Sequence, residues 1–366
     1  MMRQILISLF FTLILSQIVN SQDNNDNLFK SKNIKKTMTK AAYWQLGNPK
    51  HEQWDWTNGA FYAGISAAYK TTGDKKLLNA MLAMGEKNAW KPGPRLQHAD
   101  DHVIGQTYLD LYRLTGDEKM LKPLQSQMDV FLQTPWTPKG IETITWWWCD
   151  ALFMGPPTMT KLSQITGELK YMEKSNQLYK ECYNLLFDKE EHLFARDLGY
   201  VIKNDSLDRR EANGEKIFWS RGNGWVMGGL AILLSELPEN NVDREFYIGL
   251  FHEMSERIAG LQQEDGLWRS SLLDPQSYPG GEASGSGFYT FALTWGINNG
   301  ILEREKYLPI VKKAWIGLNT LIQEDGHVGW CQPIGADPRK NFKADSWEVY
   351  GTGAFLLAGS EIIKLK

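Results

Sequence analysis

Apolar residues recur along the chain at the 3.6-residue spacing that is typical of amphipathic helices. Three such stretches run into the same turn, Thr-Gly-Asp or Thr-Gly-Glu, within residues 67–81, 110–124 and 161–175. In each turn the glycine can adopt the left-handed conformation that ends a helix, and the acidic residue suits the start of the next helix. The repeat therefore predicts a series of helical hairpins.

Six predicted helices begin alike, with glycine or another small residue beside aromatic or acidic ones. Their starts are Trp56, Asp100, Cys149, Arg221, Ser284 and Tyr350. These helices are apolar and rich in glycine and alanine, as helices enclosed by other helices must be. Charged, amphipathic helices alternate with them, over 28–46, 75–90, 118–133, 168–187, 243–262 and 305–323.

This alternation predicts the architecture. Twelve helices joined by short turns run up and down, so all six apolar helices point the same way. We predict an all-α fold, an (α/α)6 barrel of six inner and six outer helices, formed by one domain over residues 28–366. An open helical solenoid is the alternative.

The N-terminus is typical of a secretory signal peptide. Arg3 precedes an apolar run of 11 residues, 5–15, which is shorter than the roughly 20 residues that span a bilayer. We predict a signal peptide over 1–21, a polar linker over 22–27, and an exported protein with no membrane association after cleavage. The periplasm is the expected location, and secretion from the cell is the alternative.

Composition narrows the range of partners. Lys plus Arg number 40 against 43 Asp plus Glu, a formal charge of -3, which gives no reason to expect nucleic acid as a partner. Three widely spaced cysteines support neither a disulfide framework nor a zinc site. The composition does not predict an oligomeric state.

Two groups of polar residues raise the question of a metal, and both are weak candidates. His98 and His102 are four residues apart, but the sequence offers no third ligand beside them. Asp205 and Asp208 lie in a polar loop that suits solvent better than calcium. We therefore predict neither a metal nor a cofactor.

Parallel inner helices would bring the residues at their starts together at one mouth of the barrel. Asp100, Asp101 and Asp150 would meet there with Trp56 and Trp148. Taken singly, an aspartate at a helix start is most often a capping residue and a buried tryptophan a packing residue. Taken together, aromatic walls and several acids favour a sugar-binding site, because sugar rings stack on indole faces. Two acids of different protonation are also what acid/base chemistry on a sugar requires.

The sequence resembles the unsaturated glucuronyl and rhamnogalacturonyl hydrolases of glycoside hydrolase family 105. The matching segments cover nearly the whole mature chain, and single motifs are shared with the related family 88 enzymes. They read WTNGAFYAG, TWWWCDALFMGPP, FWSRGNGWVMGGLA, QQEDGLW, EASGSGFYTFALTWGINNGIL and VYGTGAFLLAGSE. The resemblance implies an (α/α)6 barrel, in agreement with the helix count.

The resemblance also implies a reaction. Such enzymes act on lyase-generated oligosaccharides and remove the uronic acid that carries a C4=C5 double bond at the non-reducing end, by hydrating that bond. Asp150 matches the position of the acid/base residue. Asp100 is the expected second acid, with Asp101 a near-equal candidate. Arg221 and Trp225 match a substrate-contacting pair, and Arg221 could bind the uronate carboxylate bidentately.

One segment departs from the family pattern. Pectin-acting members typically have a tyrosine-histidine pair after the dipeptide Leu-Phe, where this chain has Ala195 and Arg196. An additional cation would suit an anionic aglycone, such as the sulfated rhamnose of the algal polysaccharide ulvan. We therefore predict ulvan-derived substrates over rhamnogalacturonan fragments, with a sugar epimerase and a non-catalytic sugar-binding protein as further alternatives.

Overall fold

The computed structural model describes residues 25–365. The predicted signal peptide, 1–21, and the first part of the predicted linker lie outside the described residues. No helix in the described part of the chain is long and apolar enough to span a bilayer.

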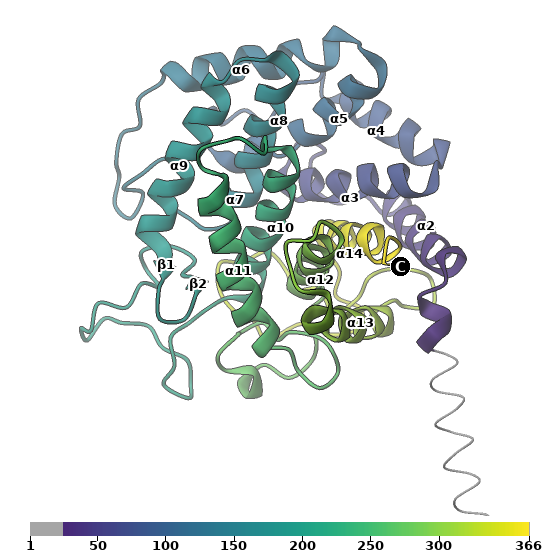
Figure 1. Cartoon of the computed structure of the whole chain (residues 1–366), viewed down its shortest axis with the longest axis vertical. Coiled ribbons are helices and arrows are strands. Elements are labelled where there is room, and N and C mark those ends of the chain that lie inside the picture. The colour runs from purple at the N-terminus through teal and green to yellow at the C-terminus, as the bar shows by residue number, and fades with distance from the viewer. Residues whose placement is uncertain (1–24, 366) are drawn as a thin grey trace, which may run out of the picture.

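Two concentric sets of helices make up the fold (Figure 1). The inner helices are α3 (Trp56–Thr72), α5 (Gly105–Thr115), α8 (Pro156–Thr166), α10 (Ser220–Glu236), α12 (Ala283–Asn298) and α14 (Val349–Ile362). The outer helices are α2 (Ser31–Gly47), α4 (Lys75–Lys87), α6 (Lys122–Gln133), α9 (Lys170–Leu186), α11 (Arg244–Gly260) and α13 (Arg304–Thr320). The predicted all-α barrel of six inner and six outer helices is therefore confirmed.

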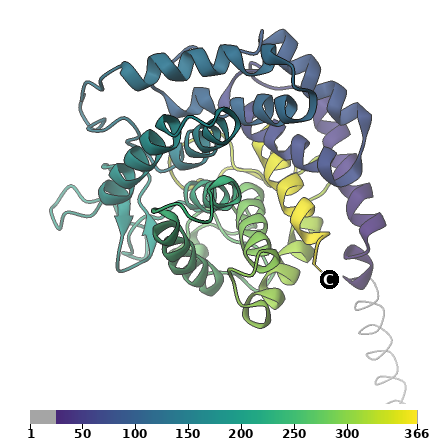
Figure 2. The same cartoon turned by 45° about the horizontal axis from the view of Figure 1, so that its top comes forward.

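The inner helices form a closed ring. Each packs against the next along the chain, and α14 returns to pack against both α12 and α3. Figure 2 shows the inner helices surrounded by the outer ones. This closure distinguishes the barrel from the open solenoid.

Shorter elements lie at the ends of the long helices. The helical ones are η1 (Ala99–His102), η2 (Glu118–Met120), α7 (Ala151–Met154) and η3 (Pro275–Ser277). Strands β1 (Phe187–Asp188) and β2 (Leu193–Phe194) pair antiparallel, with Phe187 opposite Phe194.

The repeated turns have the predicted backbone conformation. Gly73, Gly116 and Gly167 have φ angles of 72°, 71° and 74° and end α3, α5 and α8. Asp74 acts as the N-cap of α4, because its carboxylate accepts a hydrogen bond from the Lys76 amide. It thus stands just before the first turn of the next helix, where it satisfies an amide that the helix leaves unpaired.

The two mouths of the barrel differ in their connections. The segments that lead from inner to outer helices are short, as in 73–74 and 167–169. Those that lead from outer to inner helices are longer, reaching 187–219 and 321–348. Long loops therefore gather at the mouth where the inner helices begin, which is where the sequence predicts the site.

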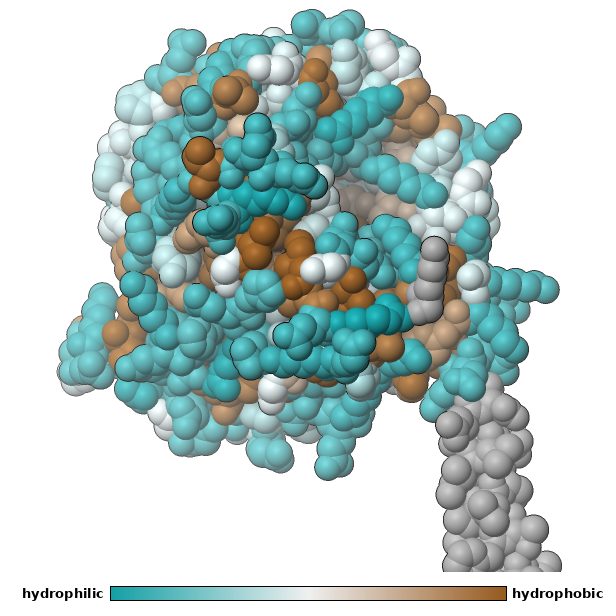
Figure 3. Space-filling view, in the orientation of Figure 1, coloured by the Kyte–Doolittle hydropathy of each residue, from teal (hydrophilic) through white to brown (hydrophobic). Residues whose placement is uncertain are grey.

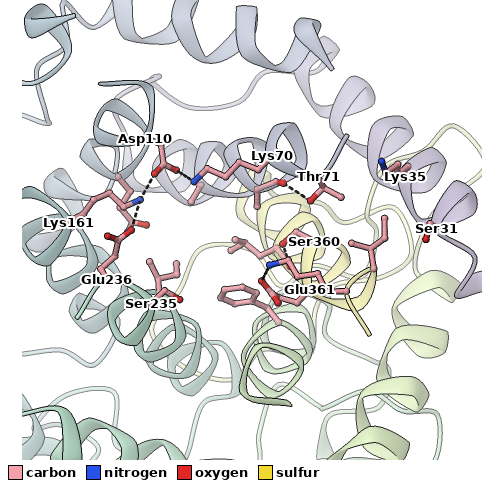
Figure 4. A pocket seen from close by; sticks show the side chains of 18 residues that line it. Ser31, Lys35, Lys70, Thr71, Asp110, Lys161, Ser235, Glu236, Ser360 and Glu361 are labelled. Carbon is pink, nitrogen blue, oxygen red and sulfur yellow. Dashed lines mark hydrogen bonds and ion pairs between the residues drawn. The ribbon is translucent and has the colours of Figure 1, made fainter. Parts of the chain in front are cut away.

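The opposite mouth carries a charged cluster around a pocket of about 520 Å³ (Figure 4). Lys161, only 5% exposed, lies 2.6 Å from Asp110 and 3.8 Å from Glu236. Lys70 binds the other carboxylate oxygen of Asp110 at 2.9 Å. These contacts tie α3, α5, α8 and α10 together, and Lys70 lies in the last turn of α3, where a cation is favourable.

The molecular face in Figure 3 shows hydrophobic side chains near its middle and hydrophilic ones around them.

The ring closes through a contact between two glycines. A Cβ on Gly64 of α3 would lie 2.5 Å from the Gly353 carbonyl oxygen, and a Cβ on Gly353 of α14 would lie 2.5 Å from the Ala60 carbonyl oxygen. Because both obstacles are backbone atoms, neither can move aside without separating the helices. The two helices can approach this closely only where side chains are absent.

We predict that Gly353→Ala lowers the free energy of unfolding by about 2 kcal/mol, since overpacking a tight contact typically has this effect. The matched control is Gly249→Ala on outer helix α11, where a Cβ would meet nothing within 4 Å. It should raise the free energy by roughly 0.5–1 kcal/mol through helix propensity. Urea unfolding measures both, and equal effects would contradict the closure argument.

Candidate active site

The carboxylates Asp100 and Asp150 lie beside each other at the mouth where the inner helices begin. Asp100 is part of η1, before α5, and Asp150 directly precedes α7, which leads into α8. Their side chains are only 15% and 13% exposed. Both side chains are thus largely withdrawn from water, as the sequence predicts for an acid pair.

Burial raises the pKa of both carboxyl groups. For Asp100, burial followed by the negative charge of Asp150 raises the pKa to about 7. For Asp150, burial raises the pKa against the opposing charges of Arg196 and Arg221. Asp100 therefore titrates in the neutral range, and burial favours the protonated form of Asp150 as well, which suits general acid catalysis.

Arg196 is the cation next to this pair. Its Nε lies 3.9 Å from Asp150 Oδ2, and its Nη1 donates to Asp197 Oδ2 at 2.7 Å. The side chain is 21% exposed, and its guanidinium lies 5.3 Å from the ring centre of Trp147. The structure thus places Arg196 at the acid itself.

Asp101 has a different environment from Asp100. It is fully buried, and its Oδ1 accepts hydrogen bonds from Nε and Nη2 of Arg95 at 3.0 and 2.5 Å. Its Oδ2 accepts the Arg95 amide at 2.6 Å. Because both oxygens hold the loop before η1, the geometry does not support the prediction that Asp101 binds substrate, and it favours Asp100 as the second acid.

Arg221 is also more enclosed than predicted. Its side chain is fully buried, and Nη1 and Nη2 donate to the carbonyl oxygens of Gln332 and Pro333 at 2.7 and 3.0 Å. Both terminal nitrogens therefore serve the main chain, and the geometry does not support a bidentate contact with a uronate carboxylate. Arg221 acts on the site through its positive charge, which opposes the rise in the pKa of Asp150 that burial causes.

The predicted aromatic residues form a connected wall. Trp56, half-buried, stacks on Tyr350 with ring centres 5.3 Å apart. Trp225 is fully buried behind it, 6.0 Å from Trp56. Trp56 is therefore the ring of this group that a sugar can reach, and Trp225 supports it from within.

Trp148 is connected to Asp100 through His98. It is 3% exposed and packs against His98 with ring centres 4.3 Å apart. His98 Nδ1 lies 3.6 Å from Asp100 Oδ2. Burial, followed by the charge of Arg95, lowers the pKa of His98 to about 3, so this ring is neutral beside the acids.

The residues considered as metal ligands have other partners. His102 is fully buried, and its Nε2 lies 2.8 Å from the Leu96 carbonyl oxygen. Asp208 accepts hydrogen bonds from the amides of Lys203 and Asn204. Across residues 25–365, no three His, Cys, Asp or Glu side chains gather closely enough to hold a metal ion.

Two residues of the site were not among the predictions. Asp197 is 4% exposed and holds Arg196, and Cys149, fully buried, points its Sγ at Asp150 Oδ2 over 3.6 Å. Their positions directly beside Arg196 and Asp150 in the sequence were the available signal.

The chain is similar to known proteins over nearly its full length. The model of Glycosyl Hydrolase Family 88 matches residues 30–366. An unsaturated 3S-rhamnoglycuronyl hydrolase of Formosa agariphila is 49% identical over 346 residues, 91% of each chain.

Two solved structures share the fold. One, named as a polysaccharide lyase, has a TM-score of 0.84 at 35% identity and covers 91% of this chain and 97% of its own. Another, a possible GH105 member from Salmonella enterica, has a TM-score of 0.77 at 20% identity and covers 91% and 94%.

The raised pKa of Asp100 predicts a pH-dependent effect on stability. An aspartate ordinarily titrates near 3.8 and this one near 7, so the folded state binds the extra proton and stability falls as the pH rises from 4 to 7. Asp100→Asn should therefore raise Tm at pH 8 by about 3 °C and change it little at pH 4. Thermal unfolding at both pH values measures this, with exposed Asp345→Asn as the control. An equal shift at both values would contradict it.

Proposed function

The chain belongs to Glycosyl Hydrolase Family 88, and from this premise we propose that it removes the 4,5-unsaturated uronic acid from the non-reducing end of lyase-generated oligosaccharides. The family match and the 49% identical relative confirm the resemblance seen in the sequence motifs and make the protein a glycoside hydrolase. The observation that carries the proposed reaction is the buried pair Asp100 and Asp150, both with a raised pKa.

In the proposed reaction Asp150 donates its proton to C4 of the unsaturated ring. The positive charge that develops at C5 is shared with the ring oxygen, and water adds at C5 while losing a proton to the Asp150 carboxylate, which restores the acid. The resulting C5 hemiketal opens by breaking its bond to the ring oxygen, which gives a ketone at C5 and a hemiacetal at C1. That hemiacetal collapses to an aldehyde and releases the aglycone as an alcohol. Asp100, with its own raised pKa, keeps the negative charge of the pair low before the proton is transferred.

The preferred aglycone is a sulfated rhamnose of ulvan origin. Arg196 supports this choice, since it puts a partly exposed guanidinium next to the acid, and a guanidinium suits sulfate or carboxylate oxygens. The name of the Formosa agariphila relative, a rhamnoglycuronyl hydrolase, points the same way. Pectin-derived rhamnogalacturonyl fragments are the second candidate.

We propose that the protein acts in the periplasm. Cleavage after residue 21 would remove the signal peptide, 1–21, and leave the linker, 22–27, at the start of the mature chain. Oligosaccharide processing there would follow depolymerisation outside the cell.

Ultraviolet absorbance of the ene-carboxylate tests the reaction. The band should disappear when the purified protein acts on unsaturated disaccharides, because hydration removes the double bond. Asp150→Asn should lower turnover at least ~100-fold, the range for loss of a general acid. A rise in absorbance with intact polysaccharide would instead show a lyase, the activity named for the 35% identical structure.

The substrate preference depends on Arg196. Arg196→Ala should lower kcat/KM for the sulfated glucuronyl-rhamnose disaccharide about 10–100-fold, as expected for loss of a charge-assisted contact. Turnover of the unsulfated rhamnogalacturonan disaccharide should change less. If the ratio of the two rates is the same in both proteins, ulvan preference does not come from Arg196.

A further inference from the structure

The three nitrogens of the Arg196 guanidinium have three different surroundings. Nη1 donates to Asp197 at 2.7 Å. Nε is buried, makes no hydrogen bond and faces Asp150 over 3.9 Å. Nη2 has no hydrogen-bond partner within residues 25–365 and belongs to a side chain that is 21% exposed. The Arg196 guanidinium therefore lies near the Asp150 carboxylate without a hydrogen bond to it. Its Nη1 is bound to Asp197, and its Nη2 remains available to a ligand.

Asp197 is itself held firmly. Its Oδ1 accepts the Gly199 amide at 2.7 Å, and it is 4% exposed. The main chain beside it is also fixed, because the Arg196 carbonyl accepts the Cys149 amide at 2.9 Å. Two residues earlier, the Phe194 amide donates to Asn223 of α10. The segment that carries Arg196 and Asp197 is therefore hydrogen-bonded to Cys149, the residue that precedes Asp150.

We propose that Asp197 is a positioning residue that keeps the Arg196 guanidinium beyond hydrogen-bond distance of Asp150 and leaves Nη2 free to bind an anionic group of the aglycone. The proposal rests on the proposed function, in which Asp150 is the acid. Without the Asp197 carboxylate, the guanidinium would be free to form hydrogen bonds with Asp150 and to hold it ionised. A catalytic acid in that state has no proton to give.

The geometry also couples recognition to chemistry. An anionic group bound at Nη2 offsets the charge of Arg196, so Asp150 holds its proton more strongly once that group is in place. A sulfated aglycone should then raise kcat in addition to lowering KM.

Other charged and titratable groups face Asp150 from several elements. They are Asp100 on η1, Cys149 beside it, Cys182 on α9 and Arg221 on α10. Arg221 is fully buried and fixed by two carbonyl groups. Of the two arginines near Asp150, Arg196 is therefore the one whose distance from Asp150 can be set by a carboxylate, that of Asp197.

The test uses Asp197→Asn, Arg196→Gln and the double variant. Its first readout is the titration of Asp150 by 13C NMR of aspartate-labelled full-length mature protein without substrate, with the signal assigned through Asp150→Asn. We expect Asp197→Asn to move the midpoint down by about one pH unit and Arg196→Gln to move it up by a similar amount. The double variant should match Arg196→Gln, because Asp197 acts through Arg196.

Kinetics supply the second readout. Since activity needs the protonated acid, the alkaline limb of kcat/KM should move in the same directions as the NMR midpoints. The wild type should also show a higher kcat with the sulfated disaccharide than with its desulfated form, and Arg196→Gln should show equal kcat values. Equal kcat values in the wild type would overturn the coupling.

A matched control separates these effects from a general change in charge. Glu86→Gln removes a carboxylate that pairs with Lys119 at 2.6 Å on the outer surface, and it should leave both readouts unchanged. An unmoved Asp150 midpoint in folded Asp197→Asn, or a double variant that differs from Arg196→Gln, would overturn the positioning role.

The outcomes also separate this inference from the proposed function. If the NMR midpoints move as expected but no unsaturated substrate reacts, the proposed function fails and the positioning role stands. If Asp197→Asn does not fold, the Arg196→Gln midpoint decides: without an upward shift, Arg196 does not act on Asp150 and the inference is overturned.

Discussion

The contact between Gly64 and Gly353 is the constraint on which the rest of the structure depends. It brings the first and last inner helices so close that a Cβ on either would meet backbone within 2.5 Å. The same principle applies at Gly229, where a Cβ would lie 2.3 Å from the Leu152 carbonyl oxygen. Tight packing of this kind closes the ring, and the closed ring gathers the starts of six parallel helices at one mouth. Residues from distant parts of the sequence meet there for that reason.

The protonation of the site follows from a competition between burial and charge. At Asp150, two cations favour the ionised form, yet the net pKa is raised because desolvation is the larger effect. At Asp100, the charge of Asp150 adds to burial and outweighs Arg95 and Arg196. His98 remains neutral beside them, so it adds no further positive charge. The balance leaves the pair able to hold a proton at neutral pH, although it stands among several arginines.

The sequence predicted the helices well and the side-chain contacts less well. Outer helices expected over 75–90 and 305–323 are observed over Lys75–Lys87 and Arg304–Thr320, because periodicity and glycine turns are local signals. The choice between Asp100 and Asp101 needed the structure, since one residue of register decides which carboxylate meets Arg95. Arg221 was assigned to substrate because nothing local reveals that its partners are carbonyl groups more than 100 residues away.

The position of Arg196 bears on why the charge of the substrate should matter. A cation that served only to bind an anionic aglycone could stand anywhere on the rim of the mouth, with no effect on the acid. Here its Nε lies 3.9 Å from the acid, where a positive charge weakens the hold of Asp150 on its proton. In the proposed reaction, that placement disfavours a neutral aglycone, and an anion that offsets the charge reverses the effect. Under the proposal, the same atom pair that disfavours uncharged substrates makes an anionic substituent part of the chemical step, and specificity arises at the acid itself.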